Sequence, residues 1–132
     1  MGMPAAKQGD KIVGVDIHIV MIPTPPVGQT TPTPLPHPFN GSIDGNLSNN
    51  VKIMGKPAAT VDSTATNSPS HVPQGGQFQK PPSNKATIKM GSPTVKINKK
   101  MAARNGDMAM TCNDPSDLPV GTVIATGTVN IG

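Results

Sequence analysis

The stretch Pro4-Ala-Ala-Lys-Gln-Gly-Asp10 decides the fold, because the chain contains two further versions of it. The second version reads Pro57-Ala-Ala-Thr-Val-Asp-Ser63, and the third reads Met101-Ala-Ala-Arg-Asn-Gly-Asp107. The copies are unequally spaced but follow the same internal order. Repetition of this kind dictates architecture before any local propensity does, so we expect three related units in one chain.

Each copy leads to a side chain that can bind a metal. His18 stands fourteen residues after Pro4, and His71 stands fourteen residues after Pro57. The third copy is followed by Cys112, the only cysteine in the chain. A single cysteine cannot form an internal disulfide, so a metal ion is the remaining candidate for a cross-link.

The composition predicts an all-β fold of short strands and loops. The 132 residues include 14 glycines and 16 prolines, which break helices, and neither Glu, Trp nor Tyr occurs. Only two aromatic residues, both Phe, are present, so burial of large side chains supplies little stability. We expect one domain over residues 1–132.

The net charge of +4 permits binding to nucleic acids or anionic membranes. The basic residues between Lys96 and Arg104 are not interleaved with aromatic side chains that could stack on bases, so we interpret them as a solvated face and expect no nucleic-acid binding. The longest apolar run near the amino terminus, Ile19–Ile22, is too short for a signal peptide. We expect synthesis in the cytoplasm.

Hydrophobic alternation over residues 11–22 predicts a strand that places Asp16, His18 and Val20 on one face. Similar patterns predict short strands at 51–55, 87–91 and 94–98, and a closing hairpin over 122–131.

Seven prolines between Pro23 and Pro38 predict an extended, polyproline-like segment. Such a segment can be a flexible linker, a ligand for proline-reading domains, or a rigid strap across a small domain. His37 favours the strap, because its flanking prolines leave it little backbone freedom to lose on binding a metal. Residues 63–84 are polar and rich in Ser, Thr and Pro, and we expect His71 to anchor them.

Three histidines and one cysteine make a complete tetrahedral donor set for zinc, and calcium or magnesium would prefer oxygen ligands. A closed set of four ligands is structural rather than catalytic. The spacing matches no compact zinc-finger pattern. The plainer interpretation is that the histidines are solvated turn residues and that the cysteine is a small buried side chain.

The three Pro-Ala-Ala-like copies, taken together with the His, His, His, Cys inventory, resemble the PAAR-repeat family. Its members form the tips of contractile injection machines: type VI secretion systems, phage-tail-like extracellular particles and some phage tails. The stretches 18–23, 34–41 and 111–115 are similar to the versions in extracellular particles. The copies depart from the family motif at 60–63 and at Met101, so the resemblance does not fix the local turns there.

The resemblance implies a small cone with pseudo-threefold internal repeats and one structural zinc ion near its apex. The implied ligands are His18, His37, His71 and Cys112. It also implies that one chain caps a trimeric β-helical spike and contacts the target membrane transiently. An effector cargo is a further candidate partner, and we expect no appended effector domain. Assembly would take place at the tip of the particle, for delivery outside the cell or into a target cell.

A spike of three identical chains presents a threefold end, and three similar repeats let one chain match it. We expect the alanine pairs to lie where the repeats pack closely, at Ala5-Ala6, Ala58-Ala59 and Ala102-Ala103. We also expect Asn113 or Asp114 to orient a ligand histidine.

Two other functions are compatible with parts of the sequence. A mononuclear zinc hydrolase would need an open coordination position and a nearby base, for which Asp16 and Asp114 are the only carboxylates close in sequence. A proline-rich adaptor would instead present residues 23–38 to a partner domain.

Overall fold

The computed structural model describes residues 2–132, which form strands and no helix, so no helix is long and apolar enough to cross a membrane. The predicted all-β fold is therefore confirmed. The strands are β1 (Met3–Pro4), β2 (Lys11–Thr24), β3 (Gln29–Gly45), β4 (Lys52–Ile53), β5 (Lys56–Pro57), β6 (Thr64–Asn67), β7 (Gln77–Phe78), β8 (Lys85–Ile88), β9 (Lys96–Ile97), β10 (Lys100–Met101), β11 (Met108–Thr111), β12 (Leu118–Ile124) and β13 (Asn130–Ile131).

Six of these strands close into an antiparallel barrel. The neighbours run β2, β3, β6, β8, β11 and β12, and β12 pairs back to β2. Strands β2, β6 and β11 each start just after one copy of the repeat, and β3, β8 and β12 lead back to the repeats. The barrel thus consists of three hairpins of unequal length, one for each copy.

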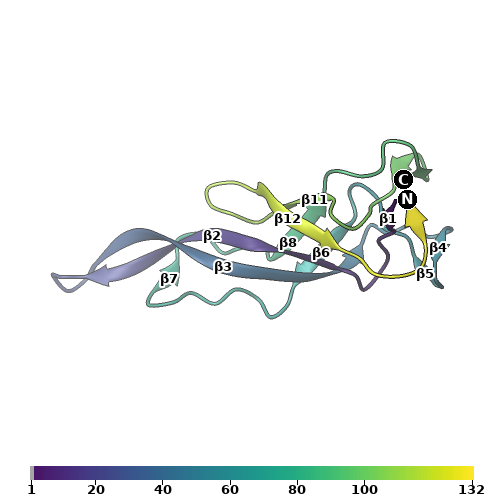
Figure 1. The fold of residues 1–132 in the computed structure, drawn as a ribbon. Coiled ribbons are helices and arrows are strands. Elements are labelled where there is room, and N and C mark those ends of the chain that lie inside the picture. Colours follow the sequence, from purple (N-terminus) through teal and green to yellow (C-terminus); the bar gives the residue numbers. More distant parts are fainter. Residues whose placement is uncertain (1) are drawn as a thin grey trace.

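The longest hairpin, β2–β3, gives the molecule its tapered shape. Its pairing runs without interruption from Lys11 opposite Ser42 to Thr24 opposite Gln29. Figure 1 shows this ribbon projecting well beyond the other strands, at the end opposite the two termini. The cone predicted from the family resemblance is confirmed in this form.

The predicted polyproline-like strap is wrong, because residues 29–45 form strand β3. Amides of successive residues in a strand point to opposite edges, so those of every second residue point to the same edge, and prolines 32, 34, 36 and 38 occupy every second position. Pairing with β2 continues along this stretch, so the missing N–H groups lie on the outer edge of β3, where no ladder needs them. The segment is therefore neither a linker nor a free ligand for proline-reading domains.

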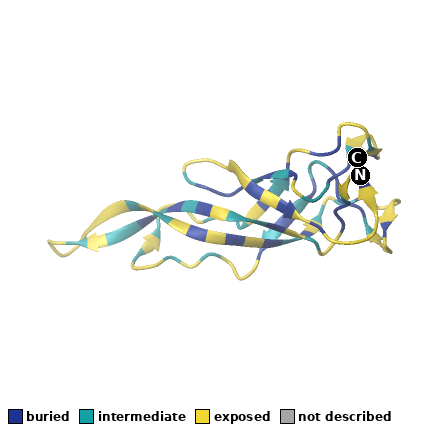
Figure 2. Cartoon of the chain, in the orientation of Figure 1, coloured by how far each residue is buried: buried dark blue, intermediate teal, exposed yellow. Residues whose placement is uncertain are grey.

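Small side chains fill the barrel. Figure 2 shows buried and exposed residues alternating along the middle of β3, as expected for a strand with one face inside. Phe39 is the largest fully buried side chain, and Ile12 and Ile43 lie beside it in one apolar cluster. Most of the other members of that cluster are alanines.

The three repeats form the wide end of the molecule, which we call the base. Three two-stranded ladders lie there, β4–β5, β9–β10 and β1–β13. The last ladder corrects the predicted closing hairpin, because β13 pairs with β1 and not with β12.

A ring of hydrogen bonds joins the copies. The amide of Ala6 donates to the carbonyl of Ala103 (2.9 Å), that of Ala103 to Ala59 (3.1 Å), and that of Ala59 to Ala6 (3.0 Å). Each copy thus contacts the next in a closed cycle, so the predicted pseudo-threefold arrangement is confirmed.

The alanine pairs lie between two apolar clusters. The second alanine of each pair (Ala6, Ala59, Ala103) belongs to the barrel cluster, and the first joins the base cluster with Ile53, Ile97 and Ile131. All six alanines are at most 2% exposed. The expectation that they lie where the repeats pack closely is therefore confirmed, since a larger side chain would overpack one of the two clusters.

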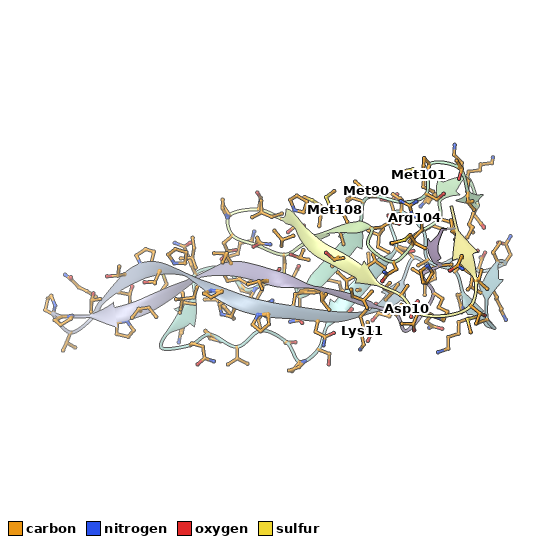
Figure 3. The ribbon with its side chains drawn as sticks, in the orientation of Figure 1. Asp10, Lys11, Met90, Met101, Arg104 and Met108 are labelled. Atoms are coloured by element: carbon orange, nitrogen blue, oxygen red, sulfur yellow. The ribbon has the colours of Figure 1, made fainter. Side chains whose placement is uncertain are left out.

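The turn after each alanine pair has the same design in all three copies. The Lys7 amide donates to the Asp10 carboxylate (3.0 Å), and the Arg104 amide donates to Asp107 (2.7 Å). Figure 3 shows Asp10 and Arg104 in this part of the molecule. In the first and third copies the turn contains a glycine with positive φ, Gly9 at 91° and Gly106 at 90°.

In the second copy, where Gly-Asp is replaced, the turn nevertheless persists. Asp62 adopts a φ of 79°, and the Thr60 amide donates to the Ser63 hydroxyl at 2.9 Å. Asp tolerates the left-handed region better than most residues, and a hydroxyl accepts the same bond that a carboxylate does. The turn at 60–63, which the resemblance left open, is therefore kept in spite of the departure from the motif.

Candidate metal centre

Side chains from four parts of the chain meet inside the narrower half of the barrel. Strand β2 contributes Asp16 and His18, and β3 places His37 directly opposite Asp16. His71 lies in the segment after β6, and Cys112 follows β11 directly. These side chains are all nearly inaccessible to solvent.

The three imidazole rings lie close to one another. The ring centroids lie 5.5 Å apart for His18 and His37, 5.0 Å for His18 and His71, and 5.4 Å for His37 and His71. With zinc–nitrogen bonds of about 2.0–2.1 Å, imidazoles at neighbouring tetrahedral positions have centroids about 5 Å apart. The spacing of the rings therefore fits a shared ion.

Cys112 completes the arrangement. Its Sγ lies 3.7 Å from Nε2 of His18, so thiol and imidazole point toward each other. Of the four side chains that the sequence analysis selected, the structure brings the donor atoms of His18, His71 and Cys112 within 4.8 Å of one another. His37 is not a member of this group, although its ring lies beside those of His18 and His71.

The hydrogen bonding of His37 fits a metal ligand. Its Nδ1 lies 3.0 Å from the carbonyl oxygen of Leu35, which can only accept, so Nδ1 carries the proton. Its Nε2 is buried and has no hydrogen-bond partner among the described residues. A buried nitrogen left with a free lone pair is costly unless it binds something, and a cation meets that need.

Burial sets the protonation of two donors. Burial lowers the pKa of His18, the nearby Asp114 carboxylate opposing this shift, and a neutral imidazole is the form that binds metals. Burial, followed by the charge of Asp16, raises the pKa of Cys112 to about 11. A metal ion would therefore have to displace the thiol proton as it binds.

Asn113 and Asp114 support the site through the backbone. The Ile17 amide donates to Oδ1 of Asn113 (2.6 Å), and the Ile19 amide donates to Oδ2 of Asp114 (2.8 Å). These two bonds fix β2 on both sides of His18. Oδ2 of Asp114 also lies 3.6 Å from Nδ1 of His18, which is beyond hydrogen-bond distance, and this nitrogen has no hydrogen-bond partner among the described residues. That Asn113 or Asp114 orients a ligand histidine therefore stays a prediction.

His71 is held by a pair of asparagines that sequence reasoning missed. Its backbone amide donates to Oδ1 of Asn84 (2.9 Å), and Nδ2 of Asn67 lies 3.3 Å from its Nδ1. A surface hollow of about 280 Å³, lined in part by His37 and His71, reaches this side of the centre. Nothing in the polar sequence around Asn67 and Asn84 distinguishes them from ordinary turn residues.

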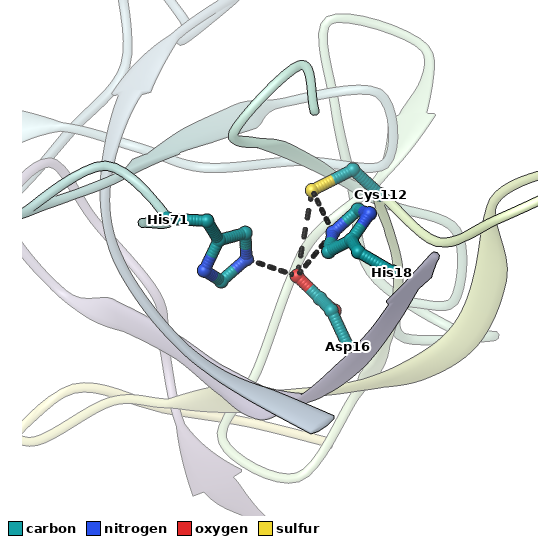
Figure 4. Close-up of side chains that lie close together, drawn as sticks. All are labelled: Asp16, His18, His71 and Cys112. Atoms are coloured by element: carbon teal, nitrogen blue, oxygen red, sulfur yellow. Dashed lines mark hydrogen bonds and ion pairs between the residues drawn. The ribbon is translucent and has the colours of Figure 1, made fainter. Parts of the chain in front are cut away.

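Asp16 was missed as a member of the centre, having been considered only as a base for a hydrolase. Asp16, His18, His71 and Cys112 form a group whose donor atoms lie within 4.8 Å of one another (Figure 4). The available signal was the spacing of Asp16 and His18, which puts both on one strand face.

Comparison with known families agrees with this architecture. The profile described as the PAAR motif matches residues 23–115, well over half of the chain. A comparison with curated proteins found no match. The family is structural rather than enzymatic, and its members sit on spike proteins. The chain therefore belongs to the PAAR motif family, the spike-tip proteins of contractile injection systems.

Proposed function

We propose that this chain, acting as a single domain, caps the trimeric β-helical spike of a contractile injection machine, with one tip chain on each trimer. The observation that carries the proposal is the closed cycle of hydrogen bonds at the base. A threefold partner requires three similar surfaces, and a single chain can supply them only by repeating itself.

We further propose that His18, His37, His71 and Cys112 bind one structural zinc ion. The support is the mutual spacing of the imidazoles, the unpaired Nε2 of His37 and the inward position of the thiol. Structural zinc sites contribute about 10–16 kcal/mol of apparent binding free energy, comparable to the stability of a whole domain. Such an ion would stiffen a core made largely of alanine.

The β2–β3 ribbon is the part that would enter the target envelope first. It is the narrow end of the molecule, opposite the base, and its turn exposes Val27 fully. In this proposal the chain is made in the cytoplasm and assembled onto the particle. It then touches the target membrane only briefly, and an effector cargo is a candidate partner of the same assembly.

Two measurements on the purified chain test the proposal. Elemental analysis should give one zinc per chain, and mixing with a trimeric spike should give one tip per three spike chains. Met54→Asp, at an exposed position of the base, should weaken spike binding. Val27→Asp, at the far end, is the matched control and should not. Equal binding by both variants, or a different stoichiometry, contradicts the capping role.

A further inference from the structure

We propose that Asp16 is a fifth donor to the metal centre and binds the ion through Oδ2, beside the three histidines and the cysteine. This inference rests on the proposed zinc site and adds to it a carboxylate ligand that the His, His, His, Cys set does not contain.

The two oxygens of Asp16 have different surroundings. Oδ1 accepts hydrogen bonds from the Thr111 hydroxyl and, at 3.5 Å, from Nδ2 of Asn113. Nδ2 of Asn113 also donates to the carbonyl oxygen of Thr111 at 3.2 Å, so the three residues hold one another in place. These hydrogen bonds fix the carboxylate through Oδ1 and leave Oδ2 directed at the other donors.

Oδ2 lies among the atoms expected to bind the ion. It is 2.8 Å from Nε2 of His71, 3.4 Å from Sγ of Cys112 and 4.0 Å from Nε2 of His18 (Figure 4). Ligand atoms around one zinc ion, with bonds of about 2.0–2.3 Å, lie about 3–4 Å from one another. The position of Oδ2 therefore matches that of a ligand.

Charge balance supports the same conclusion. Asp16 is completely buried, and the only basic side chains within 4 Å of it among the described residues are His18 and His71. Imidazoles that bind a metal are neutral, so they cannot offset a carboxylate charge once the ion is present. Zinc with one thiolate carries a net charge of +1, and the carboxylate reduces it to zero, the least costly value in a buried site.

The experiment compares the wild type with Asp16→Asn, which keeps the shape and the Oδ1 acceptor but removes the charge. Both proteins are loaded with Co²⁺, whose visible absorption is weaker in five-coordinate than in tetrahedral sites. We expect the absorption to become stronger in the variant, and zinc affinity, measured by competition with a chelator, to fall at least tenfold. Asp117→Asn, an exposed carboxylate lining the hollow beside His18 and Cys112, is the control and should match the wild type.

The outcomes separate this inference from the proposed function. A wild type that binds neither metal overturns the zinc site itself. Metal binding with the same spectrum and affinity in both proteins leaves the zinc site standing and overturns the role of Asp16, which then acts only as a hydrogen-bond acceptor for His71. If Asp16→Asn does not fold, X-ray absorption at the zinc edge of the wild type decides: five ligands support the proposal, and four overturn it.

Discussion

The two ends of this molecule are stabilised in different ways. At the base, three nearly equivalent segments are joined by backbone hydrogen bonds, and alanines separate two apolar clusters. In the narrower half, unlike side chains from hairpins of unequal length converge on one buried centre. The repeats thus give nearly equivalent structure where they touch each other. The hairpins that follow them differ in length, and the metal donors lie in these hairpins and their connections. The base should therefore survive changes that disrupt the centre.

Removal of the metal is expected to have the largest effect on stability. It should affect the narrower half of the molecule and leave the base intact. Cys112→Ser, or exhaustive chelation, should lower the free energy of unfolding by several kcal/mol, because the site loses a ligand that carries charge. Hydrogen exchange should quicken in residues 68–84 and 112–117, while the amides of Ala6, Ala59 and Ala103 stay protected. If protection against hydrogen exchange were lost equally in the base and in the narrower half, the two ends would not be stabilised separately.

Alkaline pH should lower the free energy of unfolding of the metal-free protein, by less than removal of the metal does. The Cys112 thiol has an ordinary pKa of 9.0, which is raised to about 11 in the folded state. Between these values the unfolded chain loses the proton first, so stability falls as the pH rises, by a total of about 2–3 kcal/mol.

The control for this pH effect is Cys112→Ala, studied without metal, which should lack the decrease. Zinc-loaded wild type should also lack it, because a bound thiolate carries no proton. A decrease of the same size in all three samples would assign it to other groups, such as the lysines.

At the base, Ala59→Leu should destabilise the protein by about 1–3 kcal/mol, since the added atoms have no room beside the ring of hydrogen bonds. Chemical denaturation measures the change, and Val72→Leu, at an exposed position, serves as the control. Zinc content should remain at the wild-type level. A loss of zinc in this variant would show that the base and the metal centre are coupled, contrary to this expectation.

The smallest effect is expected for a change in the turn of the second copy. Asp62→Gly gives the second copy the glycine that the other copies have at this position of the turn, and should stabilise the protein by less than about 1 kcal/mol. The ion pairs that Asp62 makes with Lys89 and Lys100 are exposed and contribute little. A clear loss of stability in thermal denaturation would show that Asp62 does more than adopt the positive φ.

Much of this arrangement could be predicted from sequence, because repetition is visible at the level of residues. The copies at Pro4, Pro57 and Met101 predicted the pseudo-threefold base, and their distance from His18 and His71 singled out the side chains that meet. The proline-rich segment was misassigned, since proline content is a local signal and the pairing of β3 with β2 is not. Asp16 was not assigned to the metal centre because the side chains that hold its carboxylate, Thr111 and Asn113, lie about a hundred residues away in the chain.

The alternating prolines of β3 also affect whether copies of the protein associate with one another. A long strand with a free edge invites strands from neighbouring chains, and such pairing leads to aggregates. From Pro32 to Pro38, every residue whose amide would face the outer edge is a proline, so this edge offers no N–H groups. The carbonyl groups of an incoming strand would therefore find no partners there. The prolines of β3 therefore prevent copies of the protein from pairing with one another along this edge, even at high protein concentration.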